Sequence, residues 1–233
     1  MTTRPALLLV HGAWHGPWCW EQLLPELAGI DVYQVALPSS GPEPAALGDL
    51  HGDAEVVRAA VRAIDGPVVV CGHSYGGMVI TQALTHEPNV ARLVYLCAFQ
   101  LDVGDSLAGV RQAPPAWWSV HEELGYLDPR EPAERFYADA APEVVAAALP
   151  RLTHQSLRSF RQPLTTAAWR HVPSTYIVCE NDNAIPAELQ RTMARRADRV
   201  VTIKAGHSPF AVAPTPVAQL LRAALTEHPR DRS

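Results

Sequence analysis

The stretch PVVVCGHSYGG, residues 67–77, is the most informative part of this 233-residue sequence. It begins with an apolar, β-branched run, passes through the five residues GHSYG and leads into a helix-like run, MVITQAL. A strand, a G-x-S-x-G turn and a helix in this order are typical of a sharp turn that exposes a serine hydroxyl at the end of a parallel sheet. Glycines beside the serine fit this interpretation, because the crowded turn has no room for a Cβ atom. The pattern therefore predicts that Ser74 is a nucleophile.

The length and composition are those of one globular domain. Hydrophobic residues make up 48% of the sequence, which is enough for a large core. The net charge of −5 argues against nucleic acid and against a membrane surface as a partner, because neither attracts an acidic protein. The apolar run Ala6–Val10 is too short for a signal-peptide core, so we expect a cytoplasmic protein. A small-molecule substrate is the expected partner, and a homodimer remains open.

Nothing in the sequence predicts a metal or a cofactor. Its four cysteines, Cys19, Cys71, Cys97 and Cys179, have no C-x-x-C spacing. Three of the four end predicted buried strands. We therefore expect buried, reduced thiols.

Short apolar segments alternate with helical patterns along the chain. The predicted strands are Ala6–Val10, Val32–Ala36, Val68–Cys71, Leu93–Ala98, Thr175–Cys179 and Val200–Ile203. Their continuous apolar character is typical of strands that are covered on both faces. The predicted helices are Trp18–Leu27, Leu50–Ile64, Tyr75–His86, Ala187–Arg195 and Val217–Leu225. This alternation predicts an α/β fold with a doubly wound, mostly parallel sheet of about six strands.

The segment between Leu101 and His171 interrupts this alternation. It has scattered prolines, no convincing strand and many aromatic residues. Helical turns are predicted at 132–138, 142–149 and 155–160. We therefore expect residues 101–171 to form a helical cap, inserted into a core of residues 1–100 and 172–233. Trp117 and Trp118 are candidate substrate contacts in this cap, while most of its aromatic side chains are expected to pack it onto the core.

A serine nucleophile needs an acid and a base, which follow it along the chain in that order. His207 is the best candidate for the base among ten histidines, because it lies late in the chain in a loop directly after a predicted strand. His73 is a poor candidate, because neighbouring residues at such a turn point in different directions. The acid is expected to be Asp182, in the loop after Thr175–Cys179, where a carboxylate can orient the imidazole. Asp102, which follows the preceding strand, is the alternative.

The loop HGAWHG, residues 11–16, follows the first predicted strand. In this arrangement a backbone N–H of the loop and the N–H after the nucleophile form an oxyanion hole. We assign these two donors to Ala13 and Tyr75. Gly12 and Trp14 are candidate substrate contacts beside them, and His11 is expected to bond to local backbone.

Three motifs carry a resemblance to a known family: LVHGAWHGPW from residue 9, GHSYGGM from residue 72 and YIVCEND from residue 176. They resemble the α/β-hydrolase superfamily and, within it, the branch of plant methylesterases, including the salicylate-binding methylesterase, and hydroxynitrile lyases. The resemblance covers the predicted core and is weak in the cap. It implies a triad of Ser74, Asp182 and His207, with oxyanion donors at Ala13 and Tyr75.

Two positions argue against the lyases of this branch. Those lyases carry lysine directly after the catalytic histidine and threonine after the first-strand histidine, where this chain has Ser208 and Gly12. Ser208 has no positive charge for a departing cyanide, and Gly12 is expected to leave room for an acyl group. We therefore expect a cofactor-free serine esterase that acts on a small, mostly apolar ester. The alternatives are a lyase, lactone-forming or cyclising enzyme with the same triad, and a ligand-binding receptor with a vestigial site.

Overall fold

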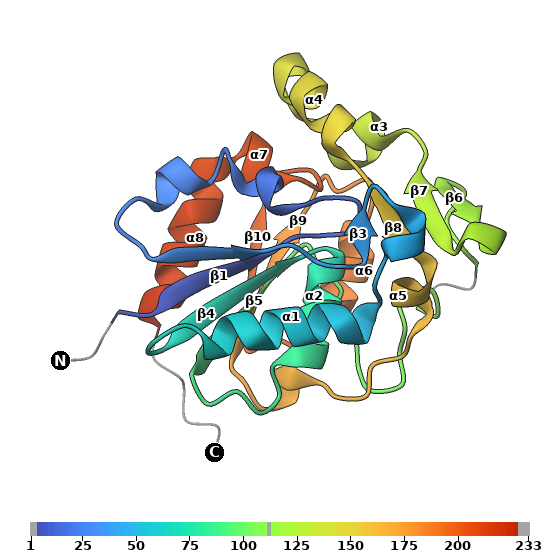
Figure 1. Ribbon diagram of the computed structural model, residues 1–233. Coiled ribbons are helices and arrows are strands. Elements are labelled where there is room, and N and C mark those ends of the chain that lie inside the picture. Colours follow the sequence, from blue (N-terminus) through green and yellow to red (C-terminus); the bar gives the residue numbers. More distant parts are fainter. Residues whose placement is uncertain (1–3, 111–112, 228–233) are drawn as a thin grey trace.

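A computed structural model describes residues 4–110 and 113–227 of the chain, and a six-stranded sheet lies at its centre (Figure 1). The strands are β1 (Ala6–Val10), β2 (Val32–Val35), β4 (Val68–His73), β5 (Val90–Leu96), β9 (Ser174–Cys179) and β10 (Arg199–Ile203). All neighbouring pairs are parallel, and the order across the sheet is β10-β9-β5-β4-β1-β2. The predicted α/β fold is therefore confirmed. Because the strands are parallel, the loops that follow them converge at one edge of the sheet.

Helices cover both faces of this sheet. They are α1 (Leu50–Arg62), α2 (Tyr75–Ala83), α6 (Ala187–Ala194), α7 (Pro209–Val212) and α8 (Pro214–Thr226), and the predicted helix at 18–27 is instead two 3₁₀ turns, Pro17–Trp20 and Leu24–Leu27. Leu8 and Val10 of β1 belong to a core that includes side chains of α1, α2 and α6. Leu7 and Leu9 belong to a second core with side chains of α8. This alternation places α1 and α2 on one side of the sheet and α8 on the other (Figure 1).

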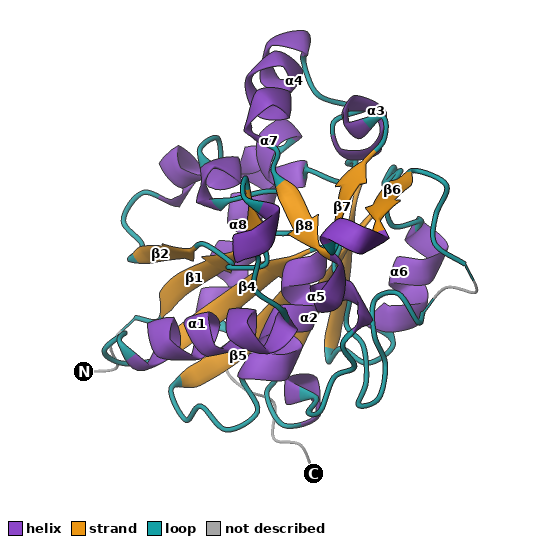
Figure 2. Cartoon of the chain, turned by 45° about the vertical axis from the view of Figure 1, so that its right-hand side comes forward, coloured by secondary structure: helices purple, strands orange, loops and turns teal. Residues whose placement is uncertain are grey.

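The segment between β5 and β9, called the insertion below, contains both helices and strands. Its helices are α3 (Pro132–Phe136), α4 (Pro142–Ala148) and α5 (Leu157–Arg161), and its strands are β6 (Trp118–His121), β7 (Tyr126–Pro129) and β8 (His154–Ser156). With β3 (Ser40–Gly41), the strands form a second, antiparallel sheet in the order β3-β8-β7-β6. Figure 2 shows β6, β7 and β8 of this sheet close to α3 and α4. The expectation of no strand here is wrong, because strands of three or four residues are too short for an alternating pattern to be recognised.

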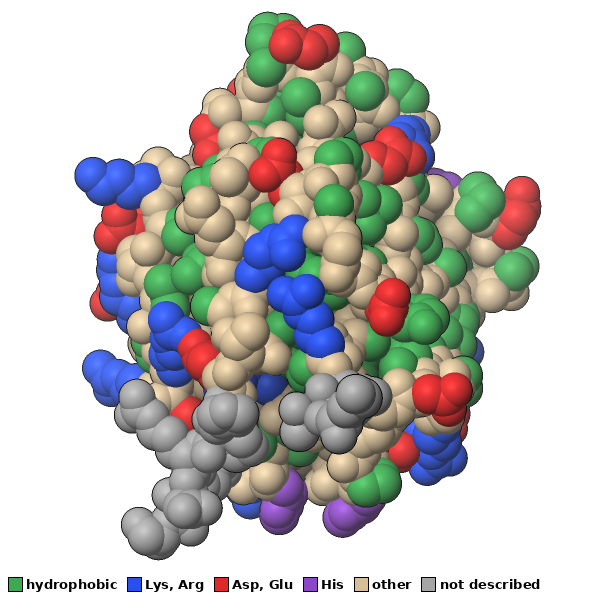
Figure 3. Space-filling view, turned by 90° about the vertical axis from the view of Figure 1, so that its left-hand side faces the viewer, with side chains coloured by type: hydrophobic (Ala, Val, Ile, Leu, Met, Phe, Trp, Pro, Cys, Tyr) green, Lys and Arg blue, Asp and Glu red, His purple; other side chains and the backbone are tan. Residues whose placement is uncertain are grey.

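The surface carries charges of both signs. On the face shown in Figure 3, acidic and basic side chains are interspersed among hydrophobic and uncharged ones, so neither sign dominates that face. In the part of the chain that the structure describes, no helix has the length and apolar character needed to span a membrane.

Candidate active site

Ser74 lies in the sharp turn between β4 and α2. Its backbone has a φ of 52° and a ψ of −121°, and residues with a side chain rarely adopt a positive φ. The turn is possible because backbone segments approach closely at two glycines. A Cβ atom at Gly72 would lie 2.6 Å from the Gly76 carbonyl oxygen, and one at Gly76 would lie 2.6 Å from the carbonyl oxygen of His11. The turn thus places the serine hydroxyl at the edge of the sheet where the strands end.

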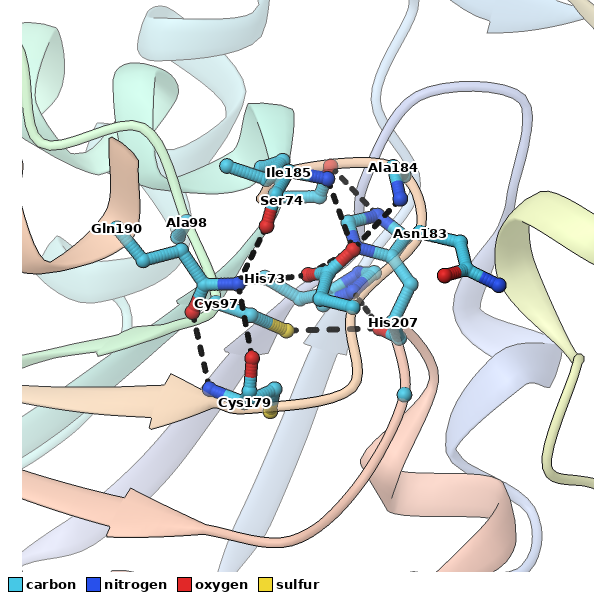
Figure 4. Close-up of polar contacts among 12 residues, drawn as sticks. His73, Ser74, Cys97, Ala98, Cys179, Asn183, Ala184, Ile185, Gln190 and His207 are labelled. Atoms are coloured by element: carbon cyan, nitrogen blue, oxygen red, sulfur yellow. Dashed lines mark hydrogen bonds and ion pairs between the residues drawn. The ribbon is translucent and has the colours of Figure 1, made fainter. Parts of the chain in front are cut away.

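His207 faces this hydroxyl from the loop after β10. Its Nε2 lies 3.1 Å from Ser74 Oγ, and its Nδ1 lies 2.8 Å from Asp182 Oδ2. The loop is held in place because the His207 carbonyl oxygen accepts hydrogen bonds from His73 Nε2 at 2.8 Å and from Cys97 Sγ at 3.4 Å. Figure 4 shows these residues converging beneath the serine. His73 therefore supports the loop of the candidate base and does not face the serine itself.

Asp182, in the loop after β9, is surrounded by hydrogen-bond donors. Its Oδ1 accepts the backbone N–H groups of Ala184 and Ile185, each at 2.8 Å. Its Oδ2 accepts Gln190 Nε2 at 2.9 Å in addition to the bond with His207. Figure 4 shows Gln190 reaching this loop from α6. These bonds fix the orientation of a buried carboxylate directly behind the imidazole.

Asp102, the alternative acid, lies elsewhere. Its carboxylate is 2.6 Å from a guanidinium nitrogen of Arg170. Of the two candidate acids, only Asp182 is hydrogen-bonded to His207.

Two backbone N–H groups flank the serine. Ala13 follows β1 and Tyr75 is the first residue of α2, and both residues border the same pocket as Ser74 and His207. Within residues 4–110 and 113–227, the structure records no hydrogen bond from either N–H group. Unpaired N–H groups at a helix N-terminus and in an adjacent loop can stabilise a negatively charged oxygen.

A small pocket opens over Ser74. Its lining is almost entirely apolar and consists of Ala13, Trp14, Ser74, Tyr75, Phe99, Leu107, Trp117, Trp118, Phe136, Phe160, Ala184, Ile185 and His207. The predicted contacts Trp14, Trp117 and Trp118 therefore all border the pocket. Sequence analysis missed Phe136 and Phe160, because nothing in their local sequence distinguishes an aromatic residue facing the pocket from one that packs the insertion.

The sequence profile of the Alpha/beta hydrolase family matches residues 7–220. The chain belongs to this family. This hydrolase is 32% identical to alpha/beta hydrolase nvfD of Aspergillus novofumigatus, over 96% of this chain and 98% of the relative. It is 30% identical to salicylic acid-binding protein 2 of Nicotiana tabacum, over 79% of this chain and 82% of that one, which confirms the predicted resemblance.

A bacterial relative and a solved structure extend the comparison. The carbendazim hydrolyzing esterase of Nocardioides sp. is 29% identical, over 93% of this chain and 98% of the relative. The crystal structure of a pyrethroid hydrolase from Sphingobium faniae JZ-2 superposes on this hydrolase with a TM-score of 0.83 at 23% identity, covering 96% of this chain and 98% of that one. At that identity the superposition shows a shared fold.

One prediction about the pocket of this hydrolase is wrong. Gly12 is not among the residues that line the pocket. A Cβ atom at this position would lie 2.8 Å from Ser74 Cβ and 2.9 Å from His73 Nδ1. The glycine therefore allows close packing against the serine turn and leaves no room for an acyl group. Ser208, which stands where the related lyases carry lysine, is fully buried and also lies outside the pocket lining.

Three other histidines of this hydrolase are buried near the candidate base. Burial lowers the pKa of His11 to about 4 and that of His15 to about 3, and it lowers the pKa of His73 well below 6.5. His11 Nδ1 donates to the Gly12 carbonyl oxygen at 2.8 Å, and its Nε2 accepts the Leu37 N–H at 3.1 Å. The bond to Gly12 confirms that His11 bonds to local backbone, and the bond from Leu37 ties the ring to a segment that follows β2. All three imidazoles are neutral at pH 7, because their lowered pKa values lie below that pH.

His73, Cys97 and His207 bring their donor atoms within 4.8 Å of one another, a spacing that could suit a metal ion. However, both ring nitrogens of His207 already bond to Ser74 and Asp182. His73 Nε2 and Cys97 Sγ bond to the His207 carbonyl oxygen. A metal would have to displace these bonds, so we assign the cluster to the support of the His207 loop.

Proposed function

We propose that this α/β hydrolase is a serine esterase that cleaves a small, mostly apolar carboxylic ester without a cofactor. The observation that carries the proposal is the hydrogen-bonded series of Ser74, His207 and Asp182 at the floor of an apolar pocket. Serine, histidine and aspartate in this arrangement can activate a hydroxyl that is otherwise a weak nucleophile. The Nocardioides relative is named an esterase, which agrees with this class of reaction.

In the proposed reaction, Ser74 Oγ attacks the acyl carbon while His207 Nε2 accepts the hydroxyl proton. Asp182 accepts the hydrogen bond from Nδ1 and stabilises the imidazolium. The N–H groups of Ala13 and Tyr75 stabilise the negative charge on the former carbonyl oxygen, and one such donor can contribute about 3 kcal/mol. His207 then protonates the leaving alcohol. A water molecule, activated by the same imidazole, releases the acid and regenerates the serine.

The pocket lining supports an uncharged substrate. Apart from Ser74 and His207 it contains no strongly polar group that faces a ligand, and it contains no Asp, Glu, Lys or Arg side chain among the described residues. Trp14, Trp117 and Phe136 contribute aromatic surface, and their ring centroids lie 5.5–5.8 Å apart. Burying a charged acid or alcohol against such walls would be unfavourable. We therefore expect apolar, and in particular aromatic, esters to be preferred.

Replacement of Ser74 tests the proposal. Ser74→Ala should reduce hydrolysis of p-nitrophenyl butyrate by about 10⁴-fold or more while the protein stays folded, because the three residues act as a unit. A fluorophosphonate probe should label the wild type at Ser74 and should not label the variant. Ser119→Ala provides a matched control, since Ser119 lies on β6 outside the pocket lining. Esterase activity that survives in folded Ser74→Ala protein would disprove the proposed mechanism.

A further inference from the structure

Behind the pocket wall, buried polar side chains connect the insertion to both segments that carry the proposed oxyanion donors. Gln155 of β8, Asp53 of α1 and Ser39 are each 0% exposed. The Ser39 hydroxyl donates to Asp53 Oδ2 at 2.5 Å and accepts a hydrogen bond from Gln155 Nε2 at 2.9 Å. Buried amides and carboxylates are unfavourable unless their hydrogen bonds are made, so a satisfied network of this kind holds its members in fixed positions.

One end of this network holds Trp14, the residue after Ala13. Trp14 has a φ of 64°, which is rare for a bulky side chain. Gln155 Oε1 accepts the Trp14 N–H at 3.3 Å, the Thr153 N–H donates to the Trp14 carbonyl oxygen at 2.9 Å, and the Trp14 indole N–H donates to the Leu127 carbonyl oxygen at 2.9 Å. All three partners belong to the insertion. They hold Trp14 in a backbone conformation that it would rarely adopt alone.

The other end of the network holds Tyr75, whose backbone N–H is the second proposed donor. The Tyr75 hydroxyl donates to Asp53 Oδ2 at 2.6 Å. The Ser39 N–H donates to Asp53 Oδ1 at 2.9 Å, which fixes the carboxylate from its other side. Hydrogen bonds therefore run without a break from the Trp14 backbone through Gln155, Ser39 and Asp53 to the Tyr75 side chain.

We propose that Gln155 and Asp53 are positioning residues of the oxyanion hole, and that the insertion thereby sets the geometry of the site as well as its walls. This inference rests on the proposed function, because it takes the N–H groups of Ala13 and Tyr75 as the oxyanion donors. Gln155 and Asp53 act through Trp14 and Tyr75 and do not border the pocket.

The physical reason is that an oxyanion hole works only when its donors are already aimed at the developing charge. Without the Gln155 amide, Trp14 would lose the partner of its N–H and could relax toward a negative φ. That rotation would turn the Ala13–Trp14 peptide group. Because this group is bonded to the Cα atom of Ala13, the turn would shift Ala13 and change the direction of its N–H. A misplacement of about 1 Å can lower a rate by about 10²-fold, even though the substrate contacts stay in place.

A pair of glutamine variants tests this inference. Gln155→Met keeps the length of the side chain and removes its hydrogen bonds. Gln82→Met is the matched control, because Gln82 also bridges the core to the insertion, bonding to the backbone N–H and the hydroxyl of Thr165, and lies outside the pocket lining. A second pair is Tyr75→Phe and Tyr95→Phe. Each of these loses one buried hydroxyl bond, to Asp53 and to Thr81 respectively.

We expect Gln155→Met and Tyr75→Phe to lower kcat by about 10-fold to 100-fold with KM changed by less than about twofold. Their affinity for a trifluoromethyl ketone, whose adduct with serine places an oxyanion in the hole, should fall in parallel with kcat/KM. The two control variants should keep wild-type values. Equal effects in test and control variants, or a rise in KM alone, would overturn the inference.

Hydrogen–deuterium exchange gives a readout that needs no ester turnover. Amides in the loop of residues 11–16 should exchange faster in Gln155→Met than in the wild type and in Gln82→Met. Faster exchange in a protein that cleaves no ester would support the positioning role and refute the esterase. Unchanged exchange in an active esterase would refute the positioning role alone. If Gln155→Met does not fold, Tyr75→Phe and Tyr95→Phe decide the question by the same measurements.

Discussion

Replacement of Asp53 by asparagine should change the pH dependence of stability in a direction that the structure determines. Asp53 is fully buried in the first turn of α1 and accepts hydrogen bonds from Ser39 and Tyr75. Burial, the largest influence, raises its pKa from 3.8 to about 6, although these hydrogen bonds act in the opposite direction. Asparagine has nearly the same shape and does not titrate, so the variant isolates the contribution of the carboxyl group.

The sign follows from proton binding. Between pH 3.8 and about 6, the folded protein holds a proton on Asp53 that the unfolded chain has released. Asp53 therefore contributes stability at low pH, and this contribution is lost as the pH rises through about 6. One pKa unit corresponds to about 1.4 kcal/mol, so the full contribution is about 3 kcal/mol. About 2 kcal/mol of it should be lost between about pH 4.5 and about pH 7.5.

The assay is urea unfolding of the wild type and of Asp53→Asn at several pH values in this range. The quantity of interest is the free energy of unfolding of the wild type minus that of the variant, which should fall by about 2 kcal/mol as the pH rises. Contributions of other titrating groups, such as the buried His11, are present in both proteins and cancel. Asp65→Asn serves as the control, because Asp65 is exposed and its replacement should give no comparable trend.

A difference that stays constant with pH would show that burial does not perturb the Asp53 carboxyl group. A difference that grows with pH would show that the hydrogen bonds from Ser39 and Tyr75 outweigh burial. Either result would refute the idea that burial dominates the energetics of this network.

Asp182→Asn should lower kcat by about 10⁴-fold, because the amide favours the wrong tautomer of His207, while Asp102→Asn should change kcat by less than about threefold. If steady-state kinetics show the reverse order, Asp102 is the acid. Trp118→Ala should raise KM for phenyl esters more than for methyl acetate at similar kcat, and no change for any ester would assign this side chain to packing. Below about pH 6.5, His11 and His15 take up protons in the unfolded chain but stay neutral in the folded protein. Acidification from pH 7 to about pH 5 should therefore lower the free energy of unfolding by about 4 kcal/mol through these two residues, while Asp53 should raise it by about 1 kcal/mol. If urea titrations show no net loss of unfolding free energy on acidification, the conclusion that His11 and His15 are buried in the neutral form is wrong. Mandelonitrile should release benzaldehyde more slowly than any phenyl ester is cleaved, since no lysine or arginine lines the pocket among the described residues, and faster release would favour a lyase.

The sequence by itself determined the sheet and the meeting point of three side chains. The four inner strands, β1, β4, β5 and β9, are buried almost throughout and appear as continuous apolar runs. The edge strands β2 and β10 are partly exposed, yet their apolar residues also placed them within a few residues of their observed bounds. Ser74, Asp182 and His207 each follow one of these strands. Because the ends of parallel strands share one edge of a sheet, their proximity could be expected from chain order alone. The nucleophile turn is a local pattern, which five residues are sufficient to specify.

Only the tertiary structure decided what surrounds these residues. Trp14 and Gln155 are 141 positions apart, and their hydrogen bond depends on how the insertion folds back onto the first loop. The second sheet pairs β3 with β8 across more than a hundred residues, so no local pattern indicates it. The position of Gly12 was also misjudged, because the space beside a glycine depends on neighbours from other strands. Such contacts arise from packing between distant segments, whereas sequence patterns report mainly on the periodicity and turns of one segment at a time.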